Sequence, residues 1–155
     1  SDSESTSAAG PSPAAATAFI HQAIPMLGSL GLEVVAIGAG SMTLRVPFEG
    51  NGNHVGTMYA GALFAIAEVP GGAIAVQLFD PARYYPVIRS MTVDYRRPAT
   101  TDVTVVAEIN SAEADRIRAT ADAEGKADFV MDLEVKDTAR RVVMTAHGDY
   151  QLRTR

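Results

Sequence analysis

The chain has 155 residues, of which 47% are hydrophobic, and 13 lysines and arginines against 18 aspartates and glutamates give a formal net charge of −5 at pH 7. This length and composition are typical of one globular domain with a hydrophobic core. Cysteine is absent from the sequence, which excludes disulfides, thiolate metal sites and cysteine nucleophiles.

The positions of the charged residues and of the histidines limit which partners and sites we expect. An acidic chain without a basic run is a poor nucleic-acid binder. The three histidines are too far apart in the sequence to predict a metal site. No lysine or arginine precedes Arg45, so the basic start of a secretory signal is missing and we expect a cytoplasmic location.

The N-terminal segment is rich in serine, alanine and proline. It predicts a disordered tail over residues 1–16, followed by a single domain over residues 17–155. From Thr17 to Leu30, apolar residues at helical spacing predict a short amphipathic helix that covers one edge of the core. His21 is expected on the surface of that helix. The apolar positions are Phe19, Ile20, Ile24 and Leu27.

Two strands are predicted next, over residues 32–37 and 42–48, because apolar and polar residues alternate in the second and a glycine-rich turn joins the two. Residues 49–56 are rich in glycine and asparagine and predict a loop. A helix is expected to begin near Thr57 as its N-cap. The N–H groups of about Met58 to Gly61 would then be free to bind an anion or stabilise an oxyanion.

A long apolar segment runs from Val55 to Phe79, and its only ionisable side chains are Tyr59 and Glu68. Its length would allow a membrane span. However, Glu68 lies in the middle, and the following Pro-Gly-Gly would break or kink a helix. A helix that is apolar on all sides in a soluble protein is a core helix wrapped by other elements. We therefore predict a central core helix and no membrane span.

The position of Glu68 in this apolar segment requires an explanation. A buried carboxylate is costly unless it is hydrogen-bonded, paired or protonated, so Glu68 is either a satisfied structural acid or a catalytic one. Ala60 and Glu68 are eight residues apart, which is about 12 Å along one helix. Reacting groups must lie within about 3.5 Å of each other. If Glu68 is catalytic, it must work with the helix N-terminus of another subunit, at a dimer interface.

The rest of the chain predicts four strands and one small helix. In the strand over residues 87–97, alternate residues are expected on one face. Asn110 with Glu113 resembles a capping box and predicts a helix that ends at Gly125, although alternation from Ile117 to Ala123 leaves a strand as the alternative. The four strands span residues 87–97, 103–109, 129–135 and 142–152, and the shared face of the first holds Val87, Arg89, Met91, Val93 and Tyr95.

This order of elements predicts the fold class. Two strands, a long helix and four further strands with a helical insertion form an α+β domain, in which one curved antiparallel sheet wraps around the central helix.

The segment from Asn53 to Gly61, NHVGTMYAG, together with Glu68 seven residues later, resembles the loop-and-helix signature of the hotdog-fold acyl-CoA thioesterases. The similar branch is that of the phenylacetate-pathway thioesterases, or an uncharacterised side branch close to it. The histidine of that signature is Tyr59 here and the next glycine is Ala60, so the contacts of the histidine do not carry over. The resemblance covers about residues 17–153 and implies the hotdog fold.

By this resemblance, the catalytic groups are the carboxylate of Glu68, the side chain of Asn53 and the backbone N–H groups of Ala60 and Gly61. Asn53 would orient the substrate or water, and the alternative is that it only holds its loop together. Ser90 could position water if its strand runs beside Glu68. The expected substrate contacts are His54, Gly56, Thr57, Tyr59, Phe64, Ser90, Arg89 and Arg96, with the arginines on coenzyme A phosphates.

The function implied is hydrolysis of an acyl-CoA or acyl-carrier thioester by a homodimer or a dimer of dimers. Coenzyme A enters only as part of the substrate, and no cofactor, metal or nucleic acid is expected. Glu68 could act as general base or as nucleophile. The alternative is a non-catalytic acyl-CoA or lipid-acyl binding module in which Glu68 is structural. A hotdog hydratase or dehydratase is a weaker alternative, because those enzymes place a histidine beside the acid.

Overall fold

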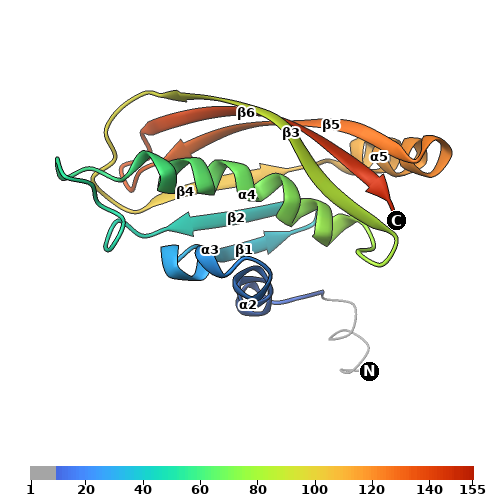
Figure 1. Cartoon of the computed structure of the whole chain (residues 1–155), viewed down its shortest axis with the longest axis horizontal. Helices are drawn as coiled ribbons and strands as arrows, with labels where there is room; N and C mark the ends of the chain where they lie inside the picture. Colours follow the sequence, from blue (N-terminus) through green and yellow to red (C-terminus); the bar gives the residue numbers. More distant parts are fainter. Residues whose placement is uncertain (1–9) are drawn as a thin grey trace.

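One sheet of six antiparallel strands wraps around a long helix, α4, in the computed structural model, which describes residues 10–155 (Figure 1). Part of the predicted tail, residues 1–9, lies outside the described residues. The elements are α2 (Pro13–Ala23), α3 (Pro25–Leu30), β1 (Glu33–Gly38), β2 (Ser41–Val46), α4 (Ala60–Leu78), β3 (Tyr84–Tyr95), β4 (Val103–Glu108), α5 (Ser111–Glu124), β5 (Lys126–Lys136) and β6 (Val142–Thr154).

The strands lie in the order β1-β2-β4-β5-β6-β3, so β1 and β3 form the two edges of the sheet. The core lies between the concave face of the sheet and α4, where Leu44, Ile66 and Leu152 are among the fully buried side chains. The α+β class and the wrapped central helix are therefore confirmed. By length and composition α4 could cross a membrane, but here the sheet wraps around it as the core helix.

The N-terminal helix differs from its prediction in two ways. It begins at Pro13, inside the segment predicted as tail, because Ser12 caps it by accepting a hydrogen bond from the Ala15 N–H. It also breaks into α2 and α3 at Ile24, which has φ −134° and ψ 87°. The residue before a proline avoids the helical region, so Pro25 ends the first helix and starts the second.

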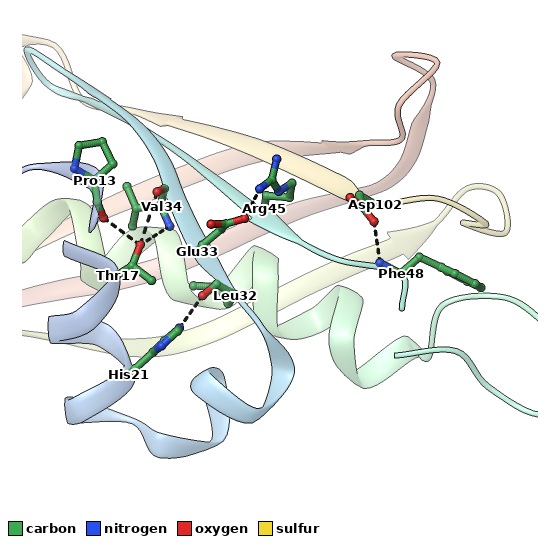
Figure 2. A network of polar contacts seen from close by, with 9 residues as sticks. All are labelled: Pro13, Thr17, His21, Leu32, Glu33, Val34, Arg45, Phe48 and Asp102. Carbon is green, nitrogen blue, oxygen red and sulfur yellow. Dashed lines mark hydrogen bonds and ion pairs between the residues drawn. The ribbon is translucent and has the colours of Figure 1, made fainter. Parts of the chain in front are cut away.

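Helix α2 covers the free edge of β1 through side chains (Figure 2). The Thr17 hydroxyl accepts from the Val34 N–H at 2.9 Å, and His21 Nε2 lies 2.6 Å from the Leu32 carbonyl. These contacts occupy main-chain groups that an edge strand would otherwise present to water or to another strand. The predicted edge-covering helix is thus confirmed, whereas the expected surface position of His21 is wrong because the ring is half-buried against β1.

A β-bulge changes the face pattern of β3. The register shifts between Ile88 and Ser90, so that Ile88 lies opposite Tyr150 and Met91 opposite Gly148. Because side chains alternate along a strand, Val87 does not share the core face with Met91. The predicted single face for this strand is wrong at that point, since a bulge inserts one extra residue.

The small helix α5 is confirmed and the alternative strand is wrong. Asn110 is its N-cap and accepts from the Glu113 N–H at 2.8 Å, and Gly125 ends it in the left-handed conformation. Ile117 and Ala121 face the core, at the end of the molecule near the C-terminus (Figure 1).

Candidate functional site

Helix α4 begins at Ala60, with Tyr59 as N-cap, and not with Thr57 as its cap. The three preceding N–H groups already have acceptors from outside the helix. Thr57 N–H donates to Asn53 Oδ1, Met58 N–H to the Ala99 carbonyl and Tyr59 N–H to the Asn51 carbonyl. These bonds keep the segment extended, so the helix cannot start until Ala60.

The loop before α4 is held by Asn53. Its Oδ1 accepts from the N–H groups of Val55 and Thr57, and its Nδ2 donates to the Thr57 hydroxyl at 2.9 Å. Gly56 closes the turn at φ 81°, a conformation that favours glycine. The side chain of Asn53 is therefore engaged inside the loop and fixes the path of the chain into α4.

Among residues 10–155, the first two N–H groups of α4 lack an acceptor and the next two have one. Those of Ala62 and Leu63 donate to the Tyr59 carbonyl, whereas those of Ala60 and Gly61 have no acceptor among residues 10–155. Both residues are exposed. Such a helix start can bind an anion or an oxyanion.

The ring of Tyr59 lies against this helix start. A Cβ atom built on Gly61 would fall 2.4 Å from Tyr59 Cε2, so only glycine leaves room for the ring there. Tyr59 is itself 61% exposed. From the end of β3, the Tyr95 hydroxyl donates to the Ala60 carbonyl at 3.4 Å. Aromatic side chains from the loop before α4 and from β3 therefore lie beside the helix start.

Glu68 lies two turns further along α4 and is half-buried. Its carboxylate makes no hydrogen bond or ion pair within the described residues. Removal from water raises the pKa of Glu68 above its ordinary value of 4.5, because burial disfavours the charged form. The structure therefore offers this acid no partner that would explain it as a satisfied structural group.

The backbone at Glu68 is supported by Tyr150 of β6. The phenolic hydroxyl donates to the Glu68 carbonyl at 2.8 Å, and the ring fills the space above Gly71. Burial, and then the charge of Glu68, raise the pKa of Tyr150, which stays neutral. Helix α4 continues through Pro70 to Leu78, so the Pro-Gly-Gly sequence does not end the predicted core helix.

A cavity of about 510 Å³ opens beside Glu68, between α2 and α4. Residues of α4 at helical spacing form one wall, and Ala16, Phe19 and Ile20 of α2 contribute to the facing wall. Among the described residues that line the cavity, only Glu68 and Gln77 have side chains with polar atoms, and the α4 wall consists of Glu68, Val69, Gly72, Ala73, Val76 and Gln77.

The uncovered face of α4 has two halves. Ala60, Phe64 and Glu68 follow one another at intervals of four residues and so lie on one side of the helix. Ala60 and Phe64 are exposed, whereas from Glu68 onwards the same face borders the cavity under α2. Glu68 therefore lies where the open half meets the cavity, about 12 Å along the helix from Ala60.

The other residues that the sequence predicted for the site lie away from Glu68 within one chain. Ser90 donates to Asp149 Oδ2 at 2.8 Å, on the sheet face opposite α4, so the chain alone does not bring it beside Glu68. Arg89 lies at the β3 bulge and Arg96 just beyond the strand, both exposed and without an ion pair among residues 10–155. His54 is exposed at the tip of the loop.

Sequence reasoning missed the cavity-lining residues Phe19, Ile20 and Gln77, and the support from Tyr150. The helical spacing of Phe19 and Ile20 was the available signal, but it cannot show which element they face. Gln77 marks a polar point in this cavity, because its Oε1 is buried without a donor in the described part of the chain. No group of three or more potential metal ligands occurs among residues 10–155.

Comparison with known proteins places the chain in a family. The model of a domain of unknown function, DUF4442, matches residues 13–152. A protein of unknown function from Pseudomonas aeruginosa, described as a probable thioesterase, is 36% identical, with a TM-score of 0.88 over 94% of this chain and 98% of that chain. The comparison with curated proteins finds no match.

Two more distant structures share the fold. A thioesterase from Haemophilus influenzae is 14% identical over 93% of this chain and 92% of that chain, with a TM-score of 0.74. A mutant thioesterase from P. aeruginosa is 19% identical over 94% and 96%, with a TM-score of 0.73. The hotdog fold implied by the resemblance is confirmed, and the chain belongs to the DUF4442 family of domains of unknown function.

Proposed function

We propose that this protein hydrolyses acyl thioesters at a site built from two copies of the chain. The observation that carries the proposal is Glu68, a half-buried carboxyl that lines an apolar cavity and has no partner among residues 10–155. An acid with a raised pKa in a cavity is typical of a general base or a nucleophile. The probable thioesterase that is 36% identical to this chain supports the same reaction class.

The second copy supplies the oxyanion site. The free N–H groups of Ala60 and Gly61 are about 12 Å from Glu68 of their own chain, too far for one reaction centre. The edge strand β3 is twelve residues long and pairs only with β6 among residues 10–155, and such an edge pairs readily with another strand. The exposed apolar side chains Tyr59, Phe64 and Tyr95 lie at the same end of the molecule as the helix start and favour its burial against a partner.

The chemistry follows from these two groups. Glu68 takes a proton from water as the water oxygen attacks the thioester carbonyl carbon, and the N–H groups of the partner's helix start stabilise the resulting oxyanion. Collapse of this intermediate breaks the carbon–sulfur bond, and the thiolate receives the proton. Direct attack by the carboxylate, with formation of a mixed anhydride that water then hydrolyses, uses the same geometry. Arg89 and Arg96 are free to contact phosphates of a coenzyme A or carrier thiol.

The first test measures thiol release from a panel of acyl-CoA esters by the wild type and Glu68→Gln. Loss of a general base lowers the rate by about 10²–10⁴-fold. Glu108→Gln, at an exposed position on β4, is the matched control and keeps wild-type activity. Equal rates for Glu68→Gln and the wild type would refute the proposal, and saturable binding without turnover by the wild type would indicate a binding module instead.

The second test asks whether one site uses two chains. Ala60→Pro removes one oxyanion N–H but suits the first helical position, because Tyr59 has ψ 136° and proline is favoured there. We expect a loss of about 10²–10³-fold in rate. When the Ala60→Pro and Glu68→Gln proteins are mixed and allowed to exchange subunits, mixed dimers contain one intact site and activity returns. If each site used a single chain, mixing would restore nothing.

A further inference from the structure

We propose that the cavity between α2 and α4 holds the acyl chain, and that the preferred substrate is a thioester of an aliphatic acid of medium length. This inference rests on the proposed function, because it takes the reacting carbonyl to lie at Glu68. It assigns a role to α2, which packs on β1 and leaves a space of about 510 Å³ between itself and α4.

The lining determines what chemistry fits. Between Glu68 and Gln77 the α4 wall presents only Val69, Gly72, Ala73 and Val76, and the facing α2 wall presents alanine, phenylalanine and isoleucine. A pantetheine arm or an adenine ring would leave its amides or ring nitrogens without hydrogen-bond partners on such a surface, which is unfavourable. A hydrocarbon chain leaves nothing unpaired. The cavity therefore fits the acyl part of a thioester and not its thiol part.

The two polar side chains set the length. Glu68 and Gln77 are nine residues apart on one helix, which corresponds to about 13 Å. An extended chain advances about 3.6 Å for every three bonds, so on the order of ten carbon–carbon bonds fill this distance. The far end is polar because the Gln77 amide donates to the Gly38 carbonyl at 3.1 Å and leaves its own oxygen buried and unpaired. A longer chain gains nothing there.

We expect the affinity for thioesters to depend on the length of the acyl chain. Each buried methylene group lowers the dissociation constant about four-fold, so affinity rises steeply from butyryl to about decanoyl or dodecanoyl esters and then levels off. Ala73→Phe fills the middle of the cavity. It should lower kcat/KM for dodecanoyl-CoA by more than about ten-fold and leave butyryl-CoA nearly unchanged. The control is Ala119→Phe on the exposed surface of α5.

A binding readout keeps the inference separate from catalysis. The sequence contains no tryptophan, so Phe19→Trp introduces a single tryptophan in the α2 wall of the cavity. Titration with the thioether S-dodecyl-coenzyme A, which cannot be hydrolysed, should shift the emission to shorter wavelength, and S-butyl-coenzyme A should do so far less. Val106→Trp, exposed on β4, should respond to neither compound.

The outcomes distinguish the two proposals. A wild type that hydrolyses no thioester, with a dodecyl-dependent shift in Phe19→Trp, would remove the proposed function and keep the acyl-chain site. Hydrolysis with a flat chain-length profile that Ala73→Phe does not alter would keep the function and overturn the inference. An emission shift that follows protein concentration and not ligand would assign the cavity to a second copy, and would also overturn it.

Discussion

The hydroxyl of Tyr150 on β6 donates a hydrogen bond of 2.8 Å to the main-chain carbonyl of Glu68 on α4. This bond joins the proposed catalytic residue to a strand 82 positions away in the sequence. The accepting carbonyl belongs to the residue two positions before Pro70, and Pro70 has no N–H to donate within the helix. The position of Glu68 thus depends on the sheet as well as on its own helix.

Tyr150→Phe tests this support. We expect the free energy of unfolding to fall by about 0.5–1.5 kcal/mol, the usual contribution of one hydrogen bond, and kcat to fall more than KM changes. Tyr85→Phe is the matched control, because the Tyr85 hydroxyl makes no hydrogen bond among residues 10–155. Denaturant unfolding and steady-state kinetics measure the two effects. Equal stability losses in both variants would show that the bond contributes nothing specific.

The two adjacent glycines of α4 should respond to alanine with opposite signs. A Cβ on Gly71 would lie 2.1 Å from Tyr150 Cζ, whereas one on Gly72 meets nothing closer than Pro86 Cγ at 3.9 Å. We expect Gly71→Ala to destabilise by about 1–3 kcal/mol through overpacking, and Gly72→Ala to stabilise by up to about 1 kcal/mol through helix propensity. Thermal unfolding of the two variants checks this, and a gain for both would contradict the observed ring position.

Glu68→Gln should change the pH dependence of stability. The pKa of Glu68 is raised in the folded state, so the folded protein binds the proton more tightly than the unfolded chain and its stability falls as pH rises through this window. The cost is absent below the unfolded pKa of about 4.5 and fully present above the folded pKa. The variant should therefore be more stable than the wild type at pH 7 and equal to it near pH 4. A difference independent of pH would show that the carboxyl carries no such cost.

His147 should stabilise the sheet only at low pH. It lies directly opposite Asp132 across β5 and β6, with Nδ1 2.6 Å from Oδ1, and Asp149 lies 3.5 Å from Nε2. The hydrogen bond to Asp132, followed by its charge, raises the pKa of His147. The contribution is fully present below the unfolded pKa of about 6.5 and is lost as pH rises through the folded pKa.

Asp132→Asn tests this pair. The variant should be less stable than the wild type at pH 5.5 and equally stable at pH 9, and NMR titration of the histidine ring protons should show a lower pKa for His147. His54, which is exposed on the loop before α4, provides an internal reference in the same spectra. An unchanged His147 titration would mean that the cross-strand contact does not form in solution.

Local patterns were enough for most of the fold. The alternation in β2, β5 and β6 marks their core-facing residues because the side-chain period of a strand is two. The Asn110 cap and the Gly125 stop are likewise local, since both act within one helical turn. Glu68 could be singled out from the sequence because a single acid in a long apolar helix is costly unless it is hydrogen-bonded, paired or protonated.

Contacts between distant residues decided the rest. The helix start moves from Thr57 to Ala60 because Met58 bonds to Ala99, and no pattern within the loop contains that acceptor. The β3 bulge arises from its pairing with β6. The sequence by itself therefore determined which elements form and which acid stands out, because periodicity and capping are local. Only the tertiary structure decided that α2 faces Glu68 across an apolar cavity, because that depends on where two helices far apart in the chain settle on one sheet.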